Sequence, residues 1–143
     1  MNVTKELKNA TTRYIEAELR AFPDIERKIA ALRSELMNPW KPSDENFGGG
    51  KSNVNISQTE IRGTNLATDE RLARLQDTRN KITRVYDRQP DLSRQFIEEF
   101  YFKNLRKFTM TGIADKLNVG ERTVYRLKKK VLEDVAEEFG LEV

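Results

Sequence analysis

The side chains with the clearest chemical potential lie in one short stretch, GIADKLNVGERTVYRLKKK, residues 112–130. Within it, Arg122, Tyr125, Arg126 and Lys129 recur at intervals of three and four residues, which would place them on one face of a helix. Guanidinium and ammonium groups donate hydrogen bonds and carry a positive charge. The chemistry that this spacing suggests is the binding of an anionic surface.

Composition argues against most kinds of catalysis. The chain has no cysteine and no histidine, which removes disulfides, the usual zinc sites and every nucleophile activated by an imidazole. Its carboxylates are scattered along helical patterns, as surface residues are. We therefore expect a protein that is not an enzyme and holds no metal or cofactor.

No targeting or membrane segment is evident either. No apolar run approaches the ~18 residues that a membrane-spanning helix needs, and the first residues lack the order of a secretory signal. We expect no membrane association, and the absence of cysteine suits a reducing cytoplasm.

Charge is unevenly distributed along the chain, although its net value is only +3. Residues 103–130 contain nine Lys or Arg against two acidic residues, a local balance of +7, whereas residues 131–143 contain five acidic residues and no base. Such a division suggests one face suited to a polyanion. The alternative is a solvated helix end whose charges serve solubility.

Periodicity predicts an all-α fold, with no strand longer than a few residues. Apolar spacing predicts helices over residues 1–22 and 25–37 on either side of Pro23, forming either an N-terminal helical hairpin within residues 1–38 or a single kinked helix. Residues 39–67 are predicted to be a loop, because they include two prolines and three consecutive glycines. This loop would serve as a hinge or as a backbone contact with phosphate or a partner.

A middle helix is predicted over residues 68–90. Thr68 offers a capping hydroxyl, Asp69 and Glu70 suit the helix dipole, and Pro90 stops the helix. The aromatic segment that follows Pro90 is expected to build a core. It begins a C-terminal domain over residues 91–143.

Two short helices and a turn are predicted inside that domain. The residues expected to face inward are Ile113, Ala114, Leu117, Val119, Val124 and Leu127. Asn118 suits the left-handed turn, and Gly120 is the expected cap of the second helix. The pattern is that of a helix-turn-helix. The alternative is a helical hairpin with a basic surface and no role in DNA binding.

If the inward positions are right, the outward ones form a DNA-binding surface. Arg122 and Arg126 could fork onto guanine, and Tyr125 could touch a thymine methyl group or a phosphate. Lys128 and Lys130 would lie nearer the DNA backbone. The full predicted set is Thr109, Thr111, Glu121, Arg122, Thr123, Tyr125, Arg126, Lys128, Lys129 and Lys130.

The sequence also resembles the RinA family of phage transcriptional activators. The resemblance is carried by FPDIERKIAALRSELMNPWKPSDENFGG (22–49), SNVNISQTE (52–60), FIEEFYF (96–102) and RTVYRLKKKVLEDVAEEFG (122–140). Phe22 stands where that family usually has tyrosine. The C-terminal part is similar to the fourth conserved region of bacterial sigma factors, which reads promoter DNA beside RNA polymerase.

The resemblance implies a sequence-specific activator of phage late genes for packaging and virion structure, in the cytoplasm of a bacterial host. It implies double-stranded promoter DNA as the partner; host RNA polymerase and a second copy of the chain are further candidates. Two other functions compete with this interpretation. One is a DNA-packaging protein such as a small terminase subunit, and the other is a helical adaptor that binds only protein.

Overall fold

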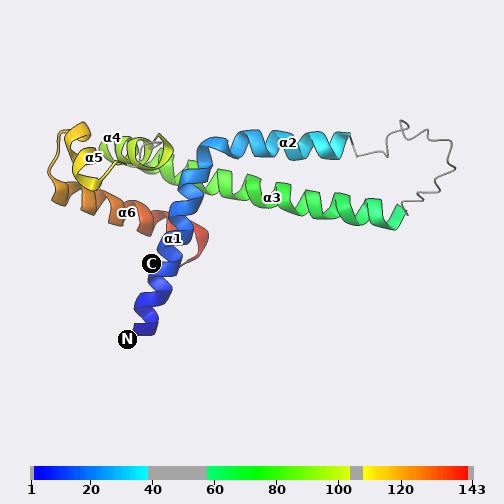
Figure 1. Ribbon diagram of the computed structural model, residues 1–143, viewed down its shortest axis with the longest axis horizontal. Helices are drawn as coiled ribbons and strands as arrows, with labels where there is room; N and C mark the ends of the chain where they lie inside the picture. Colours follow the sequence, from blue (N-terminus) through cyan, green and yellow to red (C-terminus); the bar gives the residue numbers. More distant parts are fainter. Residues whose placement is uncertain (1, 39–57, 104–107, 142–143) are drawn as a thin grey trace. The chain divides into compact units, whose positions relative to one another are not determined.

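The structure is a computed structural model that describes residues 2–38, 58–103 and 108–141. These residues contain helices and no strand, which confirms the all-α class (Figure 1). The helices are α1 (Asn2–Ala21), α2 (Ile25–Met37), α3 (Gln58–Arg88), α4 (Asp91–Ile97), α5 (Met110–Leu117) and α6 (Glu121–Phe139). A 3-10 turn, Phe22–Asp24, links α1 to α2, and a π-helix, Glu98–Phe102, follows α4. Among the described residues, no helix is both long and apolar enough to cross a membrane.

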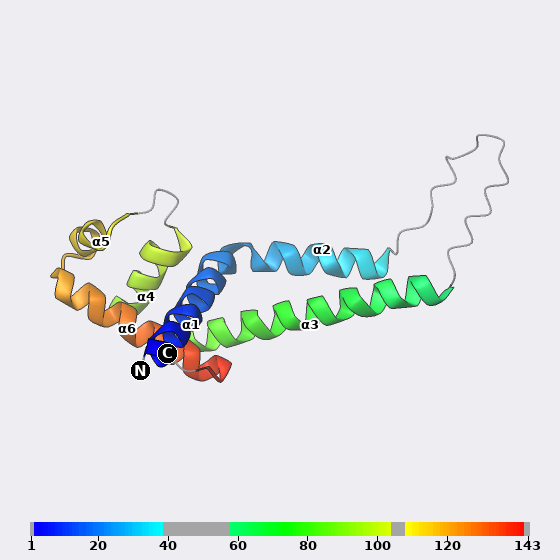
Figure 2. The ribbon, with the colours of Figure 1, turned by 60° about the horizontal axis from the view of Figure 1, so that its bottom comes forward.

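The helices group into two compact units. Unit 1 comprises Met1–Ile25 and Asp77–Val143, and unit 2 comprises Glu26–Gln76, so α3 contributes to both. In unit 2, α2 lies beside the first half of α3 in both ribbon views (Figures 1 and 2), and it buries Ile29 and Leu32. Because α1 and most of α2 fall in different units, the hairpin over residues 1–38 stays a prediction.

The start of the middle helix differs from the sequence prediction. The sequence predicts a loop over residues 58–67, yet α3 begins at Gln58 rather than at Thr68. The sequence Ser57-Gln58-Thr59-Glu60 follows the capping-box pattern of a helix start, a signal that the small polar residues around it obscured. Residues 39–57, with the predicted hinge or phosphate contact, lie outside the described residues.

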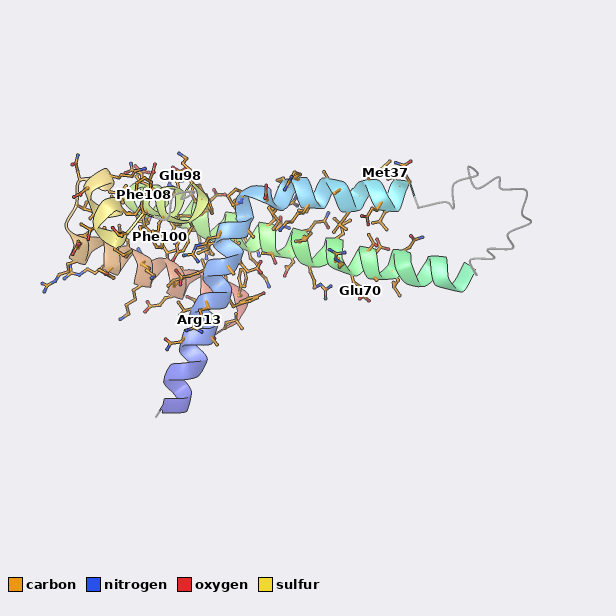
Figure 3. The ribbon with its side chains drawn as sticks, in the orientation of Figure 1. Arg13, Met37, Glu70, Glu98, Phe100 and Phe108 are labelled. Carbon is orange, nitrogen blue, oxygen red and sulfur yellow. The ribbon has the colours of Figure 1, made fainter. Side chains whose placement is uncertain are left out.

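One hydrophobic core holds unit 1 together, and all of its helices contribute to it. The buried members are Ile15, Leu19, Ile82, Val85, Phe96, Ile97, Phe100, Tyr101, Ile113, Ala114, Val124, Val131, Leu132, Val135 and Ala136. Figure 3 shows Phe100 and Phe108 among the packed side chains of α4, α5 and α6. The aromatic segment after Pro90 therefore builds the core, as its composition predicted.

The π-helix concentrates aromatic rings at the centre of this core. Phe96 and Phe100 stack with ring centroids 5.3 Å apart, and Tyr101 meets Phe100 edge-on at 4.8 Å. The wider turn of a π-helix changes which side chains share a face, and here both Phe100 and Tyr101 are buried. The rings thus fill the space between α1 and the C-terminal helices.

Polar contacts join the end of α3 to the end of α6. Glu138 accepts from Arg84 at 2.7 Å and from Arg88 at 3.2 Å, and the side-chain amide of Gln89 donates to Asp134 at 2.8 Å. The hydrogen bond from Arg84, supported by the one from Arg88, lowers the pKa of Glu138 below its ordinary value. The carboxylate is therefore stabilised in its charged form in the folded protein.

Val124→Asp is expected to unfold unit 1. Val124 is fully buried, so the substitution places an unpaired charge in a small core, at a cost of several kcal/mol, about the stability of a small domain. Tyr125→Asp is the matched control, because Tyr125 is 56% exposed and should change stability by only about 0.5 kcal/mol. Thermal melting by circular dichroism measures both. A native melting transition in Val124→Asp would show that the inward face of α6 is assigned wrongly.

Glu138→Gln is expected to reduce the loss of stability in acid. Because folding lowers the pKa of Glu138, its contribution is present above the ordinary glutamate value of about 4.3 and is lost as pH falls through the lower, folded value. Denaturant unfolding at a series of pH values from about 6 to 3 measures the effect. Glu137→Gln, the same change of charge at an exposed neighbouring glutamate, is the matched control. If the two variants showed the same dependence of unfolding free energy on pH, the lowered pKa of Glu138 would be contradicted.

Candidate nucleic-acid interface

The connection between α5 and α6 is a tight turn of three residues. Asn118 adopts the left-handed conformation, with φ 56° and ψ 43°, as the sequence predicts. The backbone N–H of Val119 donates to the carbonyl of Ala114 at 3.1 Å, which closes the end of α5. Gly120 is the N-cap residue of α6 and, as expected of glycine, provides no side-chain hydrogen bond. The turn therefore fixes the direction in which α6 leaves α5.

The residues predicted to face inward do so. Ile113 and Val124 are fully buried, and Ala114 is nearly so. Leu117, Val119 and Leu127 are partly buried and pack against the same core. This packing fixes how α6 is rotated about its own axis.

The opposite face of α6 is exposed and cationic. Arg122, Tyr125, Arg126 and Lys129 are all exposed, as their spacing predicted. Within the part of the chain that the structure describes, none of these four side chains has a hydrogen-bond or ion-pair partner. Lys130 is likewise exposed without a partner there, whereas Thr123 is half-buried. Four cations and one phenol thus remain available to a ligand.

Three other predicted residues are engaged in local contacts. Thr109 is the N-cap of α5, and its hydroxyl oxygen accepts from the backbone N–H of Gly112 at 3.1 Å. The hydroxyl of Thr111 donates to the carboxylate of Glu121, which ties the first turn of α5 to the first turn of α6. These contacts brace the two helices. A role for Thr109, Thr111 or Glu121 in contacting DNA stays a prediction.

Lys128 lies against α1, away from the exposed face of α6. Its ammonium is 3.8 Å from a carboxylate oxygen of Glu16 and 5.8 Å from the centroid of the Phe100 ring. Tyr101 donates a hydrogen bond to the same Glu16 oxygen at 2.9 Å. The contacts of Glu16 with Lys128 and with Tyr101 could not be predicted from the sequence, since no local spacing relates α1 to the π-helix or to α6.

Within the basic segment, residues 103–130, another cation is also paired. The ammonium of Lys116 is 3.3 Å from a carboxylate oxygen of Glu99 and 4.0 Å from the ring centroid of Phe108. Arg106 and Lys107 lie outside the described residues. The cations of the basic segment therefore do not form one uniform surface. Most of those that have no partner among the described residues lie on α6.

Comparison with known proteins identifies relatives along nearly the whole chain. Residues 23–137 match the family described as "Protein of unknown function (DUF722)". The chain is 34% identical over 134 residues to the protein named "Transcriptional activator rinA" of Staphylococcus phage phi11, and the match covers 94% of each chain. No solved structure matches the chain significantly. The chain therefore belongs to the RinA family of phage transcriptional activators, as its sequence motifs predicted.

Proposed function

We propose that the protein is a sequence-specific, DNA-binding activator of phage late genes that acts in the bacterial cytoplasm. The name of the phi11 relative supports the activator role. The observation that carries DNA binding is the exposed face of α6, where Arg122, Arg126 and Lys129 have no partner among the described residues. Promoter DNA is an anionic ligand, and it offers base edges that such side chains recognise.

The exposed face has the composition of a recognition helix. In this proposal the first turns of α6 enter the major groove, where Arg122 and Arg126 donate to the O6 and N7 atoms of guanine. Tyr125, which is exposed on the same face of α6, contacts a thymine methyl group or a phosphate. Lys129 and Lys130 bind phosphates and hold α6 in position.

Activation requires an effect on RNA polymerase as well as binding. The similarity of the C-terminal part of the chain to the promoter-reading region of sigma factors supports a position beside the polymerase on promoter DNA. From that position the protein would recruit the enzyme or alter the shape of the promoter. Host RNA polymerase is accordingly the proposed protein partner.

Affinity for duplex DNA is expected to fall steeply as salt rises. Four to six phosphate contacts would give a slope of roughly −4 to −5 in a plot of log affinity against log salt concentration. Fluorescence anisotropy between about 50 and 200 mM salt measures this slope. A slope near zero would remove DNA binding from the proposal and favour an adaptor that binds only protein. Native mass spectrometry on the same sample would instead favour a packaging protein if it revealed a ring of many subunits.

Arg126 and Lys130 are expected to differ in what they contribute. Arg126→Ala should cost about 1–3 kcal/mol on the preferred site and relax the base preference at one position, because it removes a contact to a base edge. Lys130→Ala should weaken preferred and random duplexes alike and make the salt slope shallower by up to about one unit. Binding of both variants to a selected site, its single-base variants and random DNA tests the difference. An equal loss on every duplex for Arg126→Ala would show that it only holds the backbone.

A further inference from the structure

Lys128 differs from the neighbouring cations of α6. Arg126, Lys129 and Lys130 are exposed and have no partner among the described residues. The Lys128 side chain is only 29% exposed, and its ammonium lies 3.8 Å from Glu16. A lysine side chain is long enough to turn toward either a neighbouring helix or a phosphate on the flank of the groove. In this structure it turns toward α1.

Glu16 is held in place to receive that ammonium. Its side chain is 13% exposed, and the buried Tyr101 donates a hydrogen bond to it at 2.9 Å. Burial, supported by the nearby Glu16 carboxylate, raises the pKa of Tyr101, so the phenol stays protonated and keeps donating. Arg20, one helical turn along α1, lies 3.8 Å from the same oxygen. These contacts hold the Glu16 carboxylate in a fixed position.

Phe100 completes the surroundings of Lys128. The ammonium of Lys128 lies 5.8 Å from the ring centroid and the guanidinium of Arg20 lies 6.0 Å from it, and both distances allow a cation–π attraction. The aliphatic stem of Lys128 is thus drawn toward α1 and the π-helix. Lys128 also lies about 200° around α6 from Arg126, which places it next to the buried stripe.

We infer that Glu16 withholds Lys128 from DNA, and that this pair limits binding to sequences other than the preferred site. The inference rests on the proposed DNA-binding function of α6. A phosphate at the flank of the groove must compete with a carboxylate that is already in place, and it also meets the negative charge of that carboxylate. Because phosphates occur in every duplex, a free Lys128 would strengthen binding to all sequences alike. Glu16 is then a specificity-determining residue that need not touch DNA.

The test measures how Glu16→Gln changes binding to random duplex DNA. Glutamine keeps the size of the side chain and an acceptor for Tyr101 but removes the charge that holds Lys128. The expected result is tighter binding to random DNA and a salt slope steeper by about 0.9, the value of one phosphate contact. Over a fourfold change in salt, that slope difference changes the affinity ratio of variant to wild type by about 3.5-fold. A purely structural role for Glu16 predicts the opposite, a loss of affinity.

Two sets of controls isolate Lys128 from other effects. Glu18→Gln makes the same change of net charge on α1, and Glu18 has no contact with Lys128 in the described structure, so its slope should match that of the wild type. Lys128→Gln should leave the slope unchanged in the wild-type background and should cancel the increase in the Glu16→Gln background. The second result excludes Arg20, which Glu16→Gln also releases.

The outcomes separate this inference from the proposed function. If wild-type protein shows no salt-dependent binding, the proposed function itself fails. If wild-type protein binds but Glu16→Gln has the wild-type slope, or Lys128→Gln makes the wild-type slope shallower, Lys128 is not withheld and the inference is wrong. Thermal melting of each variant confirms that the compared proteins are folded at the temperature of the binding assay.

Discussion

Burial of the apolar stripe on α6 is the constraint on which the rest of unit 1 depends. Val124, Val131 and Val135 are fully buried along this helix. Because a helix is a rigid element, burying one stripe determines the direction of every other residue on it. The exposed positions of Arg122, Arg126 and Lys129 follow from that packing, and no separate interaction is needed to orient them.

The stripe can be buried only because distant segments cover it. Ile15 and Leu19 of α1 are buried in the same core as α4, α5 and α6, although α1 lies at the other end of the chain. A segment as small as residues 91–143 buries a low fraction of its surface by itself and is marginally stable. The contribution of α1 and of the last turns of α3 therefore has a physical reason: it enlarges the core beneath the exposed cationic face of α6.

The sequence predicted the local features of this arrangement and missed the long-range ones. Asn118, Gly120 and the inward positions Ile113 and Val124 were predictable, because turn chemistry and helical period act over a few residues. The packing of α1 against the C-terminal helices was not, since many partners could cover an apolar stripe such as that of Ile15 and Leu19. For the same reason the position of Lys128 was predicted from its own helix alone, and its contact with Glu16 was missed.

The charged side chains of α6 differ in whether they are paired within the protein. In the sequence, the acidic residues after position 130 stand beside the basic segment. In the structure, two of them bind elsewhere: Glu138 pairs with Arg84 and Arg88 of α3, and Asp134 accepts a hydrogen bond from Gln89. These acidic side chains thus join helices within unit 1, although such exposed pairs contribute little stability individually. Among the basic side chains of α6, Lys128 is paired with Glu16, whereas Arg126 and three others have no partner among the described residues. The three others are Arg122, Lys129 and Lys130. The charge of these four unpaired cations is therefore not neutralised by the described residues. It remains on the surface that packing leaves exposed, where an anionic ligand can neutralise it.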